Sequence, residues 1–325
     1  MTHDELITVD EPAETAAADP ASAGAGEEPA AAVAAAPAHA GSDGGVRVLF
    51  VYERIGLGSA EIRGRQIAAA LGADACRFTE LEPTRTGGYD VVVYVKRVPP
   101  RAVMEAVRRT GPRQVLDLLD NFKWRKVRRV ADLVDAFIGA NHTHAALLES
   151  RFGRPAVRIP HHHCNFDDAR VPADREPPTL GYVGDSDHWP ETRKSLRGTP
   201  HRLVSLLDGE TRQQLVDAYR RIDIGVSYRK NPDKARYNSA VKLVNFMSFG
   251  IPAVLSVETG YLEVGLHGRT CLFARDAPEV RLLVDRLARD PVWRREMGMA
   301  AVEAARPYHV RAVAELYRSF LESLA

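Results

Sequence analysis

Cationic side chains gather around the expected start of an apolar helix near residue 239. They are Arg229, Lys230, Lys234, Arg236 and Lys242. Ser239 is a suitable N-cap residue, because its hydroxyl can accept a backbone N–H of the first helical turn. A helix start has free N–H groups and the positive end of the helix dipole, and both favour an anion. The spacing therefore predicts a phosphate-binding site at this helix start.

The apolar pattern predicts the elements that position these cations. Residues 240, 243, 244 and 247 are apolar and fall on one face of a helix. Gly250 suits the left-handed residue that ends a helix, and Pro252 prevents the helix from resuming. Residues 253–256 form an apolar run typical of a buried strand, and a Thr-Gly pair at 259–260 indicates a loop. The predicted unit is a helix, a tight stop, a buried strand and a loop.

This unit resembles part of a known family. Residues 242–254 (KLVNFMSFGIPAV) resemble the donor-site helix and strand of group 1 glycosyltransferases. The likeness continues through residues 260–263 (GYLE) and 265–274 (GLHGRTCLFA) to the helical end of the chain. The resemblance implies an α/β protein with two Rossmann-like domains facing a central cleft, the glycosyltransferase B-type fold. It also implies that a nucleotide-sugar binds to the C-terminal domain.

The resemblance further implies roles for individual residues. The substrate-binding residues that it implies are Gly58, Ser59, Arg229, Lys230, Ser239, Lys242, Asn245 and Glu263. Asp120 and His162 are the expected catalytic residues, since either could take the proton of an acceptor hydroxyl. We expect no cofactor besides the nucleotide-sugar substrate and no metal, because the cations would neutralise the leaving group. Enzymes of this group mostly retain the anomeric configuration.

Three positions depart from the family pattern. The family usually carries two glutamates eight positions apart, and here those positions hold Tyr237 and Asn245. Asn245 can still bond a ribose hydroxyl, but as a neutral group. Some relatives have a basic-Ser-x-x-Lys helix start instead, which Ser239 and Lys242 fit. Asp185 is the third departure, because the family commonly has an arginine soon after the preceding glycine.

The first half of the chain alternates expected strands and helices, which favours a parallel sheet. Strands are expected at residues 46–52, 89–95, 114–119 and 134–139, and helices at 59–71, 99–109 and 143–152. Gly56 and Gly58 begin a dinucleotide-binding fingerprint, but Glu61 stands at its third glycine position, so NAD binding is excluded. Ligands of such sheets lie beyond the carboxyl ends of the strands. The side chains expected there are Lys96, Arg97, Asp117, Asp120, Asn121, His142 and the histidines at 161–163.

Three consecutive histidines, at positions 161–163, raise the question of a metal site. Adjacent side chains of an extended segment point to alternate faces, so at most two could share one metal. No acidic or cysteine partner lies at a metal-ligand spacing. A phosphate-binding, acceptor-orienting or purely structural role is expected instead.

Composition divides the chain into a tail and two domains. Residues 1–45 contain nine acidic residues and no Lys or Arg, and they lack the basic start and apolar core of a signal peptide, which predicts a disordered acidic tail. The rest of the chain has 44 basic and 34 acidic residues, and its net charge of +10 suits anionic ligands. Residues 46–170 are the expected N-terminal acceptor domain. Residues 171–325 are the expected nucleotide-sugar domain with closing helices, trimmed because only about forty residues separate Gly184 from Asp223.

Three functions remain open at this point. Transfer of a sugar from a nucleotide-sugar to a glycan, lipid-linked or small-molecule acceptor leads. The alternative is a non-catalytic relative that binds a partner, a sugar or a nucleotide. Nucleic-acid binding depends on the net charge alone and is not expected. Three widely spaced cysteines and the lack of an apolar run of about eighteen residues favour a cytoplasmic protein, with peripheral membrane contact at most.

Removing residues 1–45 should leave the melting temperature nearly unchanged, because this segment has little apolar surface to bury. Differential scanning calorimetry of the full and shortened chains measures the difference. A large drop would show instead that the acidic tail docks on the basic body.

Overall fold

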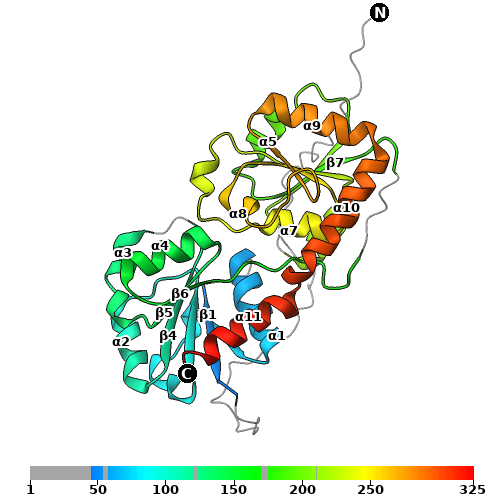
Figure 1. Ribbon diagram of the computed structural model, residues 1–325. Helices are drawn as coiled ribbons and strands as arrows, with labels where there is room; N and C mark the ends of the chain where they lie inside the picture. The colour runs from blue at the N-terminus through cyan, green and yellow to red at the C-terminus, as the bar shows by residue number, and fades with distance from the viewer. Residues whose placement is uncertain (1–44, 54–57, 121–122, 170–174, 210) are drawn as a thin grey trace, which may run out of the picture.

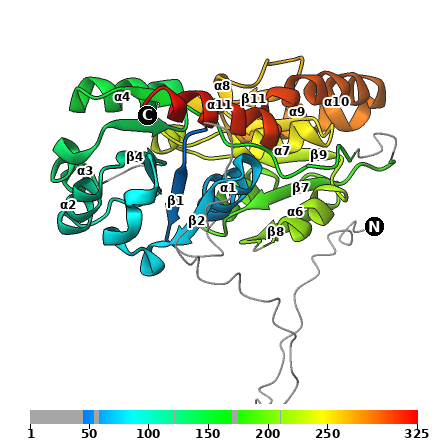
Figure 2. The same cartoon turned by 90° about the horizontal axis from the view of Figure 1, so that it is seen from below.

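The computed structural model of the chain describes residues 45–53, 58–120, 123–169, 175–209 and 211–325. They form two α/β lobes that lie side by side (Figure 1 and Figure 2). Most of the expected tail lies outside the described residues, as do Gly56, Asn121 and residues 170–174 of the segment between the lobes. Among the described helices, none is long and apolar enough to cross a lipid bilayer.

The described N-terminal lobe contains six parallel strands in the order β2-β1-β3-β4-β5-β6. The strands are β1 (Val48–Tyr52), β2 (Asp74–Arg77), β3 (Val91–Val95), β4 (Arg113–Leu118), β5 (Ala136–Gly139) and β6 (Ala156–Arg158). The helices are a π-helix (Ala60–Arg65) continued by α1 (Gln66–Leu71), then α2 (Arg101–Thr110), α3 (Trp124–Arg128) and α4 (His142–Phe152). Short 3₁₀ helices cover Phe78–Glu80, Pro83–Gly88 and Ala131–Leu133.

The described C-terminal lobe contains five parallel strands in the order β11-β10-β9-β7-β8. The strands are β7 (Leu180–Gly184), β8 (Leu203–Leu207), β9 (Ile224–Ser227), β10 (Ala253–Ser256) and β11 (Leu272–Ala274). The helices are α5 (Trp189–Ser195), α6 (Arg212–Tyr219), α7 (Val241–Ser248), α8 (Thr259–Leu262), α9 (Ala277–Arg289) and α10 (Pro291–Ala305), with 3₁₀ helices at Pro232–Ala235 and Arg306–Tyr308. The short stretch after Gly184 therefore still holds a helix, a strand and a second helix.

The central strands are largely apolar, because helices cover both faces of a parallel sheet. Every residue of β1, β3, β9 and β10 is buried. The N-terminal lobe thus has the parallel sheet that the alternating pattern predicted, and the two lobes together have the two Rossmann-like domains that the resemblance implied. β2 was not expected, because its four residues include two charged ones and no run of apolar residues. It lies at the edge of the sheet, where three of its four residues are exposed.

The last helix of the chain crosses back onto the N-terminal lobe. α11 (Val310–Glu322) follows the helices of the C-terminal lobe but lies beside α1 (Figure 1). Val313, Tyr317 and Leu321 are buried in the same core as strands β1 and β3. The closing helix, expected with residues 171–325, therefore completes the hydrophobic core of the other lobe.

A fully buried ion pair joins this helix to the N-terminal sheet. Asp117 of β4 accepts hydrogen bonds from Arg63 Nε at 3.0 and 2.9 Å and from the Tyr317 hydroxyl at 2.6 Å. Arg63 Nη1 donates to the carbonyl of Ile159 at 2.8 Å. The expectation that Asp117 lies in the cleft is wrong, because its side chain is fully buried in this network.

The lobes contact each other through the start of α4. Asn141 caps this helix with its side-chain oxygen and donates its amide to the carbonyls of Arg236 and Asn238 at 2.9 and 3.0 Å. Glu263 accepts the backbone N–H of His142 at 2.8 Å, where the positive end of the helix dipole favours a carboxylate. Two segments of the C-terminal lobe are thereby bound to one helix end of the N-terminal lobe.

An aromatic cluster completes the contact between the lobes. The ring of His144 lies 5.2 Å from that of Tyr237 and 6.5 Å from that of Trp124. His144 is fully buried, and among the described residues neither of its ring nitrogens has a hydrogen-bond partner. Burial lowers the pKa of His144 to about 4, although Asp120 opposes the shift. The imidazole is therefore neutral in the folded protein at neutral pH.

Asp117→Asn should lower the free energy of unfolding by about 3–5 kcal/mol, because Arg63 would remain buried without a counter-charge. Tyr317→Phe removes one bond to a charged acceptor and should cost about 1.5–3 kcal/mol. Urea denaturation measures both changes. Asp90→Asn, which removes a half-exposed pair with Arg47, is the control and should change little. If all three variants were equally stable, the buried network would not hold the lobe together.

The stability of the protein should fall as the pH is lowered from 6.5 towards 4. In this window the unfolded chain protonates His144 and the folded protein does not, so each pH unit costs up to about 1.4 kcal/mol for this residue. His144→Phe preserves the ring contacts and should have a shallower pH dependence than the parent in the same denaturation assay. Parallel profiles for parent and variant would contradict this assignment.

Candidate functional site

The helix expected to bind phosphate begins one residue later than its sequence suggested. α7 starts at Val241, Ala240 stands at the N-cap position, and no side chain caps the helix. The prediction that Ser239 is the N-cap is wrong. Ala240 has φ −83° and ψ 21°, unlike the extended backbone that lets a cap side chain reach back to the first turn. Gly250 ends the helix with φ +74°, as expected.

Lys242 is a buried lysine in the first turn of α7. Its ammonium donates to the Tyr182 hydroxyl at 2.9 Å and lies 3.4 Å from Asp185 Oδ2. The side chain passes over Gly184, where a Cβ would lie 2.4 Å from Lys242 Cε, so any other residue at 184 would collide with it. Burial lowers the pKa of Lys242, and the carboxylate of Asp185 partly offsets this effect. The lysine is thus fixed by internal partners at the end of β7.

The other expected cations differ in their surroundings. Arg229 Nε lies 3.1 Å from Glu258 Oε1, and both side chains are almost completely buried. Burial raises the pKa of Glu258, and the Arg229 guanidinium opposes that rise. Lys230 is exposed, and its backbone N–H donates to Glu191 at 2.9 Å. Of the predicted phosphate ligands, Arg229 and Lys242 are therefore held beside carboxylates of the same lobe.

Asn245 lies one turn after Lys242 on α7. Its side-chain oxygen accepts the backbone N–H of Cys164 at 2.8 Å, which ties the helix to the segment that crosses between the lobes. The residue is almost completely buried, and it lines a pocket between the two lobes. Asn245 is therefore at the cleft, as expected, with one of its acceptor positions already used.

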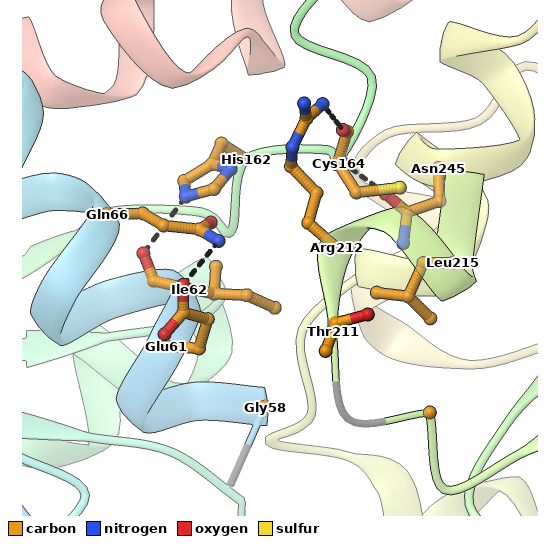
Figure 3. A pocket seen from close by; sticks show the side chains of 11 residues that line it. Gly58, Glu61, Ile62, Gln66, His162, Cys164, Thr211, Arg212, Leu215 and Asn245 are labelled. Atoms are coloured by element: carbon orange, nitrogen blue, oxygen red, sulfur yellow. Dashed lines mark hydrogen bonds between the residues drawn. The ribbon is translucent and has the colours of Figure 1, made fainter. Parts of the chain in front are cut away.

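This pocket has one wall from each lobe (Figure 3). Glu61, Ile62 and Gln66 lie on the N-terminal wall, and Thr211, Arg212, Leu215 and Asn245 lie on the opposite wall, with His162 and Cys164 between them. The pocket encloses about 50 Å³. Typical sites for ligands of nucleotide size enclose several hundred Å³. A ligand of that size therefore requires the two walls to move apart.

The two expected catalytic residues lie in different surroundings. His162 lines the pocket, but Nδ1 is 2.9 Å from the carbonyl of His163 and Nε2 is 2.9 Å from that of Ile62. Burial lowers the pKa of His162, although these two carbonyls oppose the shift. Asp120 does not line the pocket; it follows β4 with φ +60° and forms an ion pair with Lys96 at 2.8 Å. Both nitrogens of His162 are thus engaged, whereas Asp120 is half-exposed.

The remaining expected residues divide between the pocket and the lobe contact. Gly58 lines the pocket and has open space where a Cβ would lie. Ser59 precedes the π-helix with a helical backbone and makes no capping bond. Glu263 binds the start of α4 and lies 3.5 Å from Arg158 Nε, so its carboxylate is used in the contact between the lobes.

Several pocket residues were not singled out from the sequence. Thr211 caps α6, and Arg212 donates to the carbonyl of Cys164 at 3.1 Å and lies over the ring of Phe166. The amphipathic pattern of residues 211–221 is typical of a helix, but it does not show that this helix lies beside the segment around Cys164. Glu61 was noted only as the residue that interrupts the dinucleotide fingerprint, and Gln66 was visible only as a polar residue of the first helix. Only the packing of distant segments shows that they share a pocket.

The described part of the chain has no group of three His, Cys, Asp or Glu side chains placed to hold a metal ion. The three consecutive histidines are all buried, and His163 lies against His309 at 5.6 Å between ring centroids. Burial lowers the pKa of His163 to about 3. Metal independence nevertheless stays a prediction.

Comparison with known proteins agrees with this architecture. Residues 178–316 match a family model described as glycosyl transferase-like. A search of the curated proteins finds no match.

Solved structures resemble the chain over most of its length. HepE from Anabaena, solved with UDP and glucose, is 13% identical with a TM-score of 0.62, covering 86% of this chain and 100% of its own. A glycosyltransferase from Rickettsia africae is 11% identical with a TM-score of 0.64, covering 86% and 99%. Sucrose-phosphate synthase from Thermosynechococcus elongatus is 13% identical with a TM-score of 0.60, covering 85% and 100%. At these identities the likeness shows the fold. Residues 178–316 thus resemble a glycosyl transferase-like family, and the two lobes together have the glycosyltransferase B-type fold.

Proposed function

We propose that the protein transfers a sugar from a nucleotide-sugar to an acceptor hydroxyl. The observation that carries this proposal is the placement of Lys242 and Asn245 three residues apart on one face of α7. Lys242 lies at the end of β7, and Asn245 lines the pocket between the lobes. A cation beside a largely apolar pocket with a few polar side chains suits a ligand with a diphosphate at one end and a nucleoside at the other. The complex of HepE with UDP-glucose supports the same ligand class.

The geometry suggests how the parts of the donor would be arranged. The nucleoside would enter between Leu215 and Asn245 on one side and the first helix of the N-terminal lobe on the other. The diphosphate would then lie near Lys242 and Arg229, whose charges would stabilise the leaving group without a metal. Because the pocket is narrow, donor binding would require the lobes to separate and close again.

The acceptor would bind on the N-terminal side. Its oxygen would form a bond to the anomeric carbon as the bond from that carbon to the diphosphate oxygen breaks, with retention of configuration. Asp120 would take the hydroxyl proton, because its carboxylate is accessible while both nitrogens of His162 face carbonyls. Positioning both substrates between the lobes would supply much of the rate.

A second function, binding without catalysis, is favoured by one specific observation. Lys242 and Arg229 are each paired with an internal carboxylate, Asp185 and Glu258, which reduces the positive charge available to a diphosphate. A protein of this kind would bind a nucleotide or a sugar weakly, or serve as a partner subunit. Sugar transfer from any donor distinguishes the two functions.

A thermal-shift screen of UDP, GDP, TDP and ADP and their sugar conjugates, with and without EDTA, tests the leading proposal. A ligand at one hundred times its Kd should stabilise the fold by about 2.7 kcal/mol. Lys242→Met keeps the packing of the aliphatic chain and removes the charge, so it should weaken binding by roughly 10- to 150-fold. Lys194→Met, at an exposed position of α5, is the matched control.

Two results would count against this mechanism. Equal affinity of the parent and Lys242→Met would remove Lys242 from the donor site. Sugar transfer that stops on chelation and returns with magnesium or manganese would show that the side-chain cations do not suffice.

A further inference from the structure

Glu61 places a carboxylate on the N-terminal wall of the pocket between the lobes (Figure 3). It occupies the position where a dinucleotide fingerprint would have its third glycine. A glycine there allows close packing of backbone, whereas a glutamate adds an acceptor for hydrogen bonds. Among the described residues that line the pocket, Glu61 is the only acidic one.

The carboxylate is fixed in place by its own helix. Arg65 donates to Glu61 from Nε at 2.8 Å and from Nη2 at 2.9 Å, and Gln66 Nε2 donates at 2.9 Å. Burial alone would raise the pKa of Glu61, but the bonds from Arg65 and Gln66 outweigh burial and lower it. Glu61 is therefore ionised and accepts hydrogen bonds.

The pair Glu61 and Gln66 still has acceptor positions to offer. A carboxylate can accept about four hydrogen bonds, and the described residues use three. Because the amide nitrogen of Gln66 donates to Glu61, its amide oxygen is directed elsewhere, and Gln66 also lines the pocket. Two acceptors side by side, one of them charged, match the two adjacent hydroxyls of a ribose.

The opposite wall is a poorer acceptor of the same hydroxyls. The one side-chain oxygen of Asn245 already accepts the N–H of Cys164 at 2.8 Å. The Thr211 hydroxyl accepts the N–H of Gln214 at 3.2 Å in its capping role. A neutral amide bonds a hydroxyl more weakly than a carboxylate does. The pocket thus has its strong acceptor on the N-terminal side.

We propose that Glu61, supported by Gln66, binds the ribose hydroxyls of the nucleotide. This inference depends on the proposed function, because it assigns the ribose of that donor to the pocket. The ribose would bridge the lobes, with Asn245 on one side and Glu61 on the other. After the lobes have separated to admit the nucleotide, these contacts would draw them back around it.

The test compares ribose and deoxyribose ligands on the full chain by calorimetric titration. UDP, 2′-deoxy-UDP and 3′-deoxy-UDP are titrated into the parent and Glu61→Gln, with the GDP and ADP series alongside. The parent should bind the ribonucleotide roughly tenfold or more tightly than at least one deoxy analogue. Glu61→Gln should lose this preference and bind the ribonucleotide as weakly as the parent binds that analogue. Glu105→Gln breaks an equivalent i, i+4 pair with Arg101 on α2 and should keep the preference.

The outcomes separate the inference from the function on which it depends. A parent that binds none of these nucleotides, and does not bind TDP in the thermal-shift screen, would overturn both. A parent that binds UDP, GDP or ADP, with a ribose preference unchanged in Glu61→Gln, would overturn the role of Glu61 alone. Melting temperatures of the variants, which should match the parent, confirm that a loss of preference does not come from unfolding.

Discussion

One buried guanidinium connects four parts of this protein. Arg63 pairs with Asp117 of the N-terminal sheet and donates a hydrogen bond to the carbonyl of Ile159, where the chain leaves that lobe. Asp117 in turn accepts a hydrogen bond from Tyr317 of the last helix. A buried charge is tolerated only when its partners are complete, so none of these segments can move independently without a large cost. Arg63 lies within the π-helix, two residues after Glu61 and one after Ile62. The same network therefore fixes the wall of the pocket.

The C-terminal side of the cleft is organised by paired charges. Lys242 reaches its position only because Gly184 has no side chain. There its ammonium group donates a hydrogen bond to Tyr182 and pairs with Asp185. Arg229 forms an ion pair with Glu258, whose carboxylate also accepts a hydrogen bond from the Ser256 hydroxyl. These pairs stabilise the buried cations. A diphosphate that binds here would have to compete with Asp185 and Glu258 for the same positive charges. The glycosyltransferase B-type fold is thus combined with cations that are already paired with carboxylates of their own lobe.

The sequence predicted the sheets better than it predicted the site. Apolar runs such as residues 91–95 and 253–256 are strands because local composition suffices to bury them. Ser239 was misassigned as a cap because the backbone near it is shaped by contacts from Asn141 and from Gly260, which lies too close to Asn238 to carry a side chain. Asp117 was placed in the cleft by its position at the end of a strand, yet Arg63 and Tyr317 bury it. Such partners are up to 200 residues away in sequence, so local patterns cannot show them.

The return of α11 to the first lobe means that the chain passes between the lobes twice. The two passages touch: the N–H of His163 donates to the carbonyl of Tyr308 at 2.9 Å, and His309 lies against both His163 and Phe166. A single flexible connection would let one lobe swivel and slide over the other. Two connections bonded side by side restrict that freedom, so we expect the cleft to open by rotation about the line along which these passages meet.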